Sequence, residues 1–276
     1  MENIYLLIFI GFLIGTIGTL IGAGGGFILV PLLILTSGLD PNSITAISMA
    51  VVACNALSGT VAYMRSKKVD YKAGILFALC TIPGSILGVL TTQVIPRNIF
   101  DAIFGVVLLG LSIFLFVKGQ KGKAGNTMIK KEKGMVFHEL TDRDGKYYSY
   151  NYNIRNGMIL SVIVGYFSPL LGIGGGIIHV PAMTEWLHFP VHIATATSHF
   201  ILAVMATVSV VTHYLEGSYN NPQVLKMVIG LAIGVIPGAQ LGAYFSKKVN
   251  DKIIIRSLAF CLGIVAIRIF ISGIAG

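Results

Sequence analysis

Gly22-Ala23-Gly24-Gly25-Gly26-Phe27-Ile28-Leu29-Val30-Pro31 organises this chain, because the pattern returns as Gly172-Ile173-Gly174-Gly175-Gly176-Ile177-Ile178-His179-Val180-Pro181. Each copy places a glycine cluster directly before a short apolar segment. The cluster is not a P-loop, which would end in Gly-Lys-Ser/Thr. It is not a dinucleotide fingerprint either, since that needs a preceding β-strand and a downstream acidic residue. Two copies in a hydrophobic chain predict a membrane protein made of two related halves.

The composition agrees with a membrane protein. Of 276 residues, 55% are hydrophobic and only 11% are charged, against about 25% charged in soluble domains. The N-terminal apolar stretch lacks a basic region and a small-residue cleavage site, so it is expected to remain as a membrane segment. Stretches that approach or reach membrane-spanning length lie at 4–21, 44–64, 73–92, 98–117, 156–171, 193–214, 224–245 and 253–272, with shorter ones at 27–37 and 177–187.

The distribution of charge and of cysteines argues against a nucleic-acid binder and against a cysteine metal site. The net charge of +9 does not indicate a nucleic-acid binder, because the basic residues occupy loops between apolar spans. The cysteines Cys54, Cys80 and Cys261 fall inside apolar segments without metal-ligand spacing, so we interpret them as buried free thiols. No cofactor motif is evident.

Two further blocks extend the repeat. Residues 45–48 (Thr-Ala-Ile-Ser) match 195–198 (Thr-Ala-Thr-Ser), and the Pro-Gly-x-x-x-Gly block at 83–88 matches 237–242. We therefore predict an all-α integral membrane fold with two inverted repeats, each a glycine-turned re-entrant or broken hairpin plus three transmembrane helices. The predicted units are an N-terminal repeat at 1–118, a polar connector at 119–153 and a C-terminal repeat at 154–276.

The orientation follows from lysine and arginine, which accumulate in cytoplasmic loops. Basic residues cluster at 65–72, 118–155 and 247–256, which leaves Arg97, Lys226 and Arg268 outside these regions. The loop after the third span is then cytoplasmic, whereas its counterpart at 215–223 is external. This places the halves in opposite orientations, as in many secondary transporters, and it predicts a multi-pass protein of the cytoplasmic membrane with a cytoplasmic connector.

The segments after the glycines are too short to span. About eleven residues make roughly 16 Å of helix, or half of the hydrocarbon core. We infer that each glycine cluster ends a hairpin near the membrane midplane, where irregular backbone is tolerated only against protein or a water-filled cavity. The alternative is that the glycines merely permit close helix packing.

The connector differs from the rest of the chain. It is polar, and its residues alternate on both sides of Asp144-Gly145, which predicts a small β-hairpin. Its role is either a link between the halves or regulation.

Two helix starts at Phe27 and Ile177 would present unpaired N–H groups and positive dipole ends to one cavity, which predicts an anion site. Hydroxyl, amide and imidazole side chains near the two turns would complete it. The predicted substrate-binding residues are Gly22, Gly24, Gly25, Gly26, Phe27, Ser48, Asn55, Ser168, Gly172, Gly174, Gly175, Gly176, Ile177, His179, Thr197, Ser198, His199 and Gln240, with Thr45, Ser58, Thr60 and Thr195 nearby.

The histidines gather in the second half. Five of the six histidines lie between 179 and 213. Ionisable residues inside a membrane are costly and generally functional, so His179 and His199 are candidates to carry a coupling proton or to pair with the anion. His188, His192 and His213 are expected near helix ends. A metal path through His188 and His192 is the alternative, but no carboxylate or thiol cluster joins them.

These residues resemble the sulfite exporter TauE/SafE family, also described as the toluene sulfonate uptake permease group. The paired Gly-x-Gly-Gly-Gly-(Phe/Ile)-Ile-x-Val-Pro blocks and the Pro-Gly-x-x-x-Gly blocks carry the resemblance, which covers nearly the whole chain and is weakest in the connector. It implies an integral membrane transporter of small sulfur-containing anions, such as sulfite, thiosulfate or organosulfonates like sulfoacetate.

The sequence therefore predicts a secondary transporter that moves such an anion by alternating access. Export is the expected direction, because an inside-negative potential favours it by about 2.3 kcal/mol per charge and 100 mV. Uptake would require coupling, with protons as the natural coupling ion. The alternatives are an anion channel, a metal-ion transporter that uses the histidines and, last, a membrane enzyme, for which no nucleophile–base pair is evident.

Overall fold

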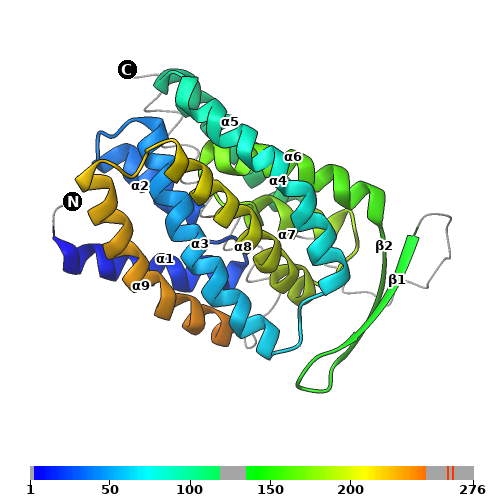
Figure 1. The fold of residues 1–276 in the computed structure, drawn as a ribbon. Coiled ribbons are helices and arrows are strands. Elements are labelled where there is room, and N and C mark those ends of the chain that lie inside the picture. Colours follow the sequence, from blue (N-terminus) through cyan, green and yellow to red (C-terminus); the bar gives the residue numbers. More distant parts are fainter. Residues whose placement is uncertain (1–2, 119–134, 247–259, 261–262, 264–276) are drawn as a thin grey trace.

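In a computed structural model the protein is a bundle of helices with one β-hairpin at its side (Figure 1). The structure describes residues 3–118, 135–246, 260 and 263; the predicted last span at 253–272 lies outside the described residues. In chain order the helices and strands are α1 (Ile4–Ile21), α2 (Gly26–Thr36), α3 (Pro41–Arg65), α4 (Tyr71–Val94), α5 (Arg97–Lys118), β1 (Met135–Thr141), β2 (Tyr147–Asn153), α6 (Ile154–Leu171), α7 (Gly176–Glu185), α8 (Val191–Leu215) and α9 (Pro222–Ser246).

Short polar side chains set where several helices begin. The side chains of Asn3, Asp40, Asp70 and Asn153 accept hydrogen bonds from backbone N–H groups in the first turns of α1, α3, α4 and α6. Such N-caps satisfy donors that the helix itself leaves unpaired. Each cap precedes an apolar run, so the polar residues between runs mark the ends of the spans.

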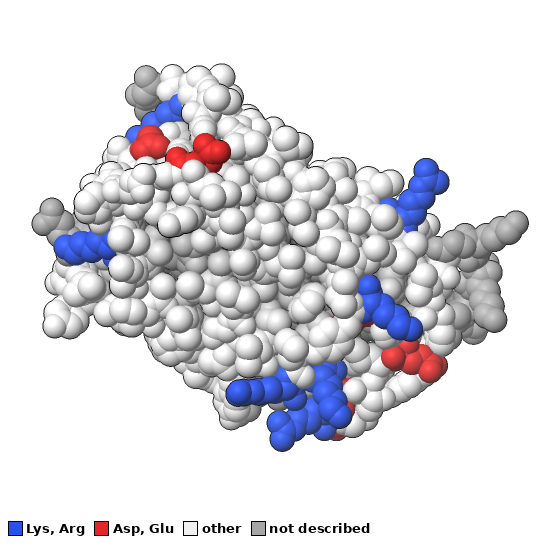
Figure 2. All heavy atoms as spheres, in the orientation of Figure 1, with Lys and Arg blue, Asp and Glu red and all other residues white. Residues whose placement is uncertain are grey.

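Among the residues that the structure describes, six helices are long and apolar enough to cross a membrane: α1, α3, α4, α6, α8 and α9. Many of their outward side chains are apolar, as in Ile75 and Leu79 of α4 and Ile229 and Ile233 of α9. On the face shown in Figure 2, charged side chains lie towards the two ends of the bundle, with an uncharged surface between them. This distribution is that of a multi-pass membrane protein.

Glycines bring helices of different halves together. α1 runs parallel to α9, and α4 runs parallel to α6 (Figure 1). A Cβ atom on Gly234 would overlap the carbonyl of Ile8, and one on Gly88 would overlap the carbonyl of Tyr166. Only glycine permits such an approach, as at many helix interfaces in membranes. The first helix of each half therefore packs against the other half, and the two halves interlock.

α3 and α8 cross the centre of the bundle in opposite directions. At one end Asn42 Nδ2 donates to Ser218 Oγ (3.1 Å), and towards the other end the ring of Tyr63 lies 5.4 Å from that of His199. Because α1 starts beside the start of α9 and α6 starts beside the start of α4, the two glycine hairpins enter the bundle from opposite ends. Which end faces the cytoplasm stays a prediction.

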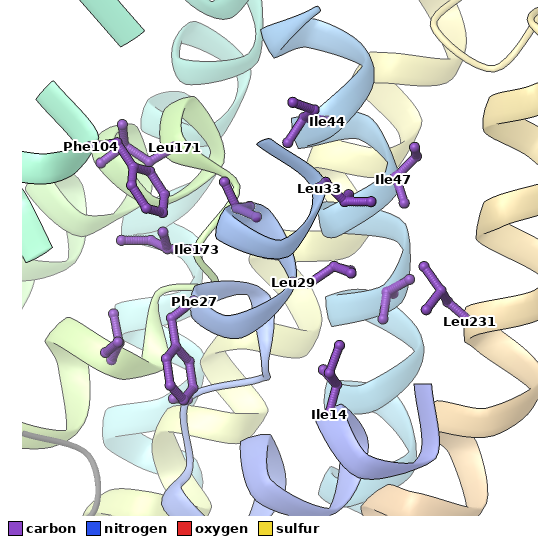
Figure 3. Close-up of a cluster of buried hydrophobic side chains, with 14 of the residues drawn as sticks. Ile14, Phe27, Leu29, Leu33, Ile44, Ile47, Phe104, Leu171, Ile173 and Leu231 are labelled. Atoms are coloured by element: carbon purple, nitrogen blue, oxygen red, sulfur yellow. The ribbon is translucent and has the colours of Figure 1, made fainter. Parts of the chain in front are cut away.

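The largest core cluster surrounds α2 (Figure 3). Phe27, Leu29 and Leu33 are fully buried, and they pack among side chains of α1, α3, α5, α6 and α9. α2 is apolar on all sides, which is the pattern of a helix enclosed by others. The short helix is thus held by the long ones around it.

The end of the connector forms the β-hairpin. β1 and β2 pair antiparallel from Met135↔Asn153 to Thr141↔Tyr147. Tyr150 and Tyr152 point inward, and each ring lies 4.8 Å from that of Phe189, just before α8. Tyr150 Oη also donates to Asp70 Oδ2 (2.8 Å). The hairpin therefore packs against the end of the bundle that holds the α3–α4 loop.

Candidate functional site

The two glycine turns meet at the centre of the molecule. A Cβ atom on Gly26 would overlap the carbonyl of Gly172, and one on Gly176 would overlap the carbonyl of Gly22. The helices that follow have 11 residues (α2) and 10 residues (α7), and each begins at the last glycine of its cluster. The two helix starts thus converge, with their positive dipole ends and unpaired N–H groups near one point. These glycines serve both of the roles considered for them, as turns and as close contacts.

The two turns differ in backbone conformation although their sequences match. Gly25, the N-cap of α2, has φ 87°, a left-handed conformation. Its counterpart Gly175, the N-cap of α7, has φ −57°, which any residue can adopt. The two turns therefore differ at the residue that precedes the short helix.

Side chains of α3 and α8 contact the turns in a reciprocal way. Cα and Cγ2 of Thr195 lie against Gly22, and the same atoms of Thr45 lie against Gly172. Ser48 Oγ donates to the carbonyl of Gly172 (2.5 Å). Ser198, the repeat counterpart of Ser48, is fully buried but its hydroxyl has no hydrogen-bond partner. The symmetric scaffold thus carries an asymmetric set of hydrogen bonds.

A chain of hydrogen bonds braces the first turn. Asn55 Nδ2 donates to the carbonyl of Gly24 (2.7 Å), and Asn55 Oδ1 accepts from Thr19 Oγ1 (2.7 Å). His199 Nε2 lies 3.3 Å from Thr19 Oγ1, and Tyr63 Oη donates to the Thr19 carbonyl (2.8 Å). All four side chains are buried, so α1, α3 and α8 are tied together beside the turn.

The second turn has a simpler environment. His179, in the first turn of α7, is buried, and its Nε2 lies 3.3 Å from Ser161 Oγ of α6. Ser168, just before the turn, is fully buried and its hydroxyl has no partner.

Several buried polar atoms near the turns therefore have no protein partner: Ser168 Oγ, Thr195 Oγ1, Ser198 Oγ and His199 Nδ1. An unsatisfied buried polar group costs about 1–3 kcal/mol, and each such group needs an explanation. Among the described residues the buried charged side chains are Lys68, Asp70 and Asp142, all near the β-hairpin. The centre is thus polar and uncharged, with hydroxyl donors suited to an oxyanion.

Two of the predicted residues lie away from the turns or serve another contact. Gln240 is exposed, and its Nε2 donates to the carbonyl (2.6 Å) and Oγ (2.9 Å) of Ser58, joining α9 to α3. Thr197 Oγ1 accepts from the N–H of Asp70 (3.0 Å) and so ties α8 to the start of α4. Phe27 and Ile177 contribute backbone, since their side chains are in the apolar core.

Sequence reasoning missed Thr19, Ser161 and Tyr63. When the two repeats are aligned, Thr19 corresponds to a proline at position 169, so the repeat did not indicate a polar role for Thr19. Thr19 and Tyr63 contact His199 of the other half, whereas Ser161 contacts His179 of its own half. Within the described residues, no three His, Cys, Asp or Glu side chains are grouped so as to hold a metal ion.

Comparisons with known proteins agree with this architecture. The sequence model of the family described as "Sulfite exporter TauE/SafE" matches residues 7–269. The chain is 32% identical over 276 residues to the "Probable membrane transporter protein YunE" of Bacillus subtilis, covering 98% of both chains. It is 27% identical to "Probable membrane transporter protein MJ0441" of Methanocaldococcus jannaschii, covering 95% of this chain and 93% of that one.

A plant relative carries the family name. The chain is 31% identical over 130 residues to the "Sulfite exporter TauE/SafE family protein 3" of Arabidopsis thaliana, which covers 45% of this chain and 27% of that protein. No solved structure shows significant similarity. The family match over most of the chain, and the bacterial relative that aligns from end to end, show that this membrane protein belongs to the sulfite exporter TauE/SafE family.

Proposed function

We propose that the protein is a secondary transporter that moves a small sulfur-containing oxyanion, such as sulfite, thiosulfate or sulfoacetate, by alternating access. The observation that carries the proposal is the meeting of the two glycine turns beside four buried polar atoms without partners. Hydroxyl and N–H donors suit an anion with several acceptor oxygens. Membership of the sulfite exporter TauE/SafE family supports a sulfur-containing anion as the substrate.

The packing of the turns supports a carrier more than a channel. The turn backbones touch each other at the centre of the bundle, so passage there requires the halves to move. The hairpins enter from opposite ends, which suits a mechanism in which each turn faces one side. Rocking of the interlocked halves would expose the anion to one side and then to the other. For a bare anion, the inside-negative potential favours export.

Ser198 offers a sharp test of this site. Because its hydroxyl has no partner in the structure, Ser198→Ala is expected to leave the melting temperature of the purified protein unchanged without ligand. The same change is expected to weaken stabilisation by the anion, with an apparent Kd raised about tenfold, since one hydrogen bond to a charged group contributes about 1.5–3 kcal/mol. Thermal unfolding in detergent against sulfite, thiosulfate and sulfoacetate measures both effects.

Ser209 provides the matched control. It is a fully buried serine of the same helix, and its hydroxyl is already bonded to the carbonyl of Met205 (3.0 Å). Ser209→Ala is expected to keep the anion response of the wild type. Sulfate, a carboxylate and divalent metals complete the panel. Stabilisation by metals alone, or equal anion responses in Ser198→Ala and wild type, would remove the proposed site.

A further inference from the structure

The directions of the hydrogen bonds beside the first turn determine which nitrogen of His199 carries the hydrogen. The carbonyl of Gly24 can only accept, so the Asn55 NH₂ group must face it and Asn55 Oδ1 must face Thr19. At 2.7 Å from that oxygen, Thr19 has to donate its single hydroxyl hydrogen to Asn55. Thr19 Oγ1 can then only accept from His199, so Nε2 carries the hydrogen.

Nδ1 of the neutral ring is then an unprotonated lone pair, buried and without a partner. His199 lies on the same face of α8 as Thr195 and Ser198, since residues three and four apart are neighbours on a helix. Both of their hydroxyls are also unpartnered. The ring lies beside the backbone of Gly22 as well, which places it at the first turn. A lone pair directed at an anion repels it, whereas a protonated Nδ1 donates to it.

We propose that the anion binds together with one proton, and that Nδ1 of His199 holds this proton. The proton comes from solvent and forms an N–H bond at Nδ1, which then donates to an anion oxygen beside Thr195 and Ser198. The inference rests on the proposed function, because it concerns the same site. One proton cancels one charge of the bound anion in the low-dielectric centre, where an isolated charge is costly.

Few other titratable groups lie near the ring of His199. Tyr63 of α3 is in edge contact with it. Asp70 at the start of α4 reaches α8 through the hydrogen bond of its N–H to Thr197, but its carboxylate faces His138 and Tyr150 of the hairpin. His179 of α7 is directed to Ser161. Among the described residues, no carboxylate is therefore placed to take the proton from His199 or to hold it permanently.

A co-bound proton alters the energetics of transport. With one proton, a dianion such as thiosulfate crosses with one net negative charge instead of two, so the membrane potential favours its export less. An inward proton gradient acts on the same complex in the opposite direction and favours uptake. The co-bound proton thus shifts the balance of transport from export towards uptake.

Calorimetry on the purified wild-type protein tests the proposal directly. Thiosulfate is the probe, because it does not titrate between pH 6 and 9, and binding is measured in two buffers with different protonation enthalpies. We expect uptake of about one proton per anion at alkaline pH, with Kd rising about tenfold per pH unit there. Binding without proton uptake and with a flat pH profile overturns the proposal while leaving the proposed function in place.

Two variants assign the proton. Gln at position 199 can still donate to Thr19 but cannot titrate, so His199→Gln is expected to bind thiosulfate weakly, without proton uptake. His213→Gln is the control, because His213 is equally buried on α8 but lies at its far end beside Ser218; it should retain the uptake. Uptake that persists in His199→Gln places the proton elsewhere. If no sulfur anion of the panel binds to the wild type, this proposal and the proposed function both fail.

Discussion

Single residues at the hairpin end show how the polar connector is fixed to an apolar bundle. Asp142, in the turn between β1 and β2, is buried; its Oδ1 accepts from the N–H groups of Asp144 (3.0 Å) and Lys146 (2.9 Å). Its Oδ2 lies 3.6 Å from Lys68 Nζ, in a pair that solvent barely reaches. Burial would raise the pKa of Asp142, but these N–H groups and the charge of Lys68 together lower it.

This lowered pKa gives a pH dependence. A carboxylate whose pKa is depressed in the folded state stabilises it above the unfolded pKa, and that contribution is lost as pH falls through the folded pKa. We expect amide hydrogen exchange in 135–153 to report constant protection from neutral pH to about pH 5, and a loss only below about pH 4. Asp142→Asn should reduce the protection by about 2 kcal/mol at pH 7. Equal exchange in variant and wild type at pH 7 would show that the carboxylate does not hold the hairpin.

At the scale of elements, the two glycine turns differ between the matching halves. Gly25 has φ 87° and Gly175 has φ −57°, while Ser48 is bonded across to Gly172 and Ser198 is not bonded. In a carrier with inverted repeats, the second state is expected to exchange these conformations between the halves. Gly175 would then need a positive φ that it does not have in this structure.

Alanine substitutions at Gly25 and Gly175 test whether the second turn changes conformation during transport. Gly175→Ala keeps the present conformation, with its Cβ 3.0 Å from the ends of Met205 and Val164, so we expect little change in unfolding free energy. Gly25→Ala should destabilise the protein by about 1–2 kcal/mol, because its φ is positive and its Cβ would meet Ile14. Transport in proteoliposomes is expected to fall strongly in Gly175→Ala despite its stability. Full transport by this variant would mean that the second turn does not change conformation.

At the scale of the whole molecule, the halves interlock through their first helices. α1 belongs to one half in sequence but packs along α9 of the other, and α6 packs along α4 in the same way. The hairpins enter from opposite ends, and α3 and α8 run antiparallel. If the bundle spans the membrane as the basic loops predict, the ends of α3 and α8 lie on opposite sides.

Cysteine labelling tests that orientation. Arg65 and Glu216 are exposed at the ends of α3 and α8. In a background with Cys54, Cys80 and Cys261 replaced by alanine, Glu216→Cys is expected to react with a membrane-impermeant maleimide in intact cells. Arg65→Cys should react only after permeabilisation, since its loop is predicted to be cytoplasmic. Reaction of both positions from the same side would show that the halves are not inverted in the membrane.

Six of the predicted spans and the two short helices could be predicted from the sequence. Runs of apolar residues bounded by capping residues specify helices locally, and the repeated glycine cluster marks both turns, because these features depend on neighbours in the chain. α2 and α7 accordingly begin where Gly26 and Gly176 end the clusters.

The hydrogen-bond partners of each polar side chain could not be predicted from local sequence patterns. Ser48 and Ser198 occupy matching positions, yet only Ser48 is bonded across the centre. Gln240 joins α9 to α3, and Thr19 fixes the hydrogen on His199 without any signal in the repeat. Local pattern determines which segments become helices. Contacts between distant segments determine which polar atoms remain free for a ligand, because they depend on how the two interlocked halves pack.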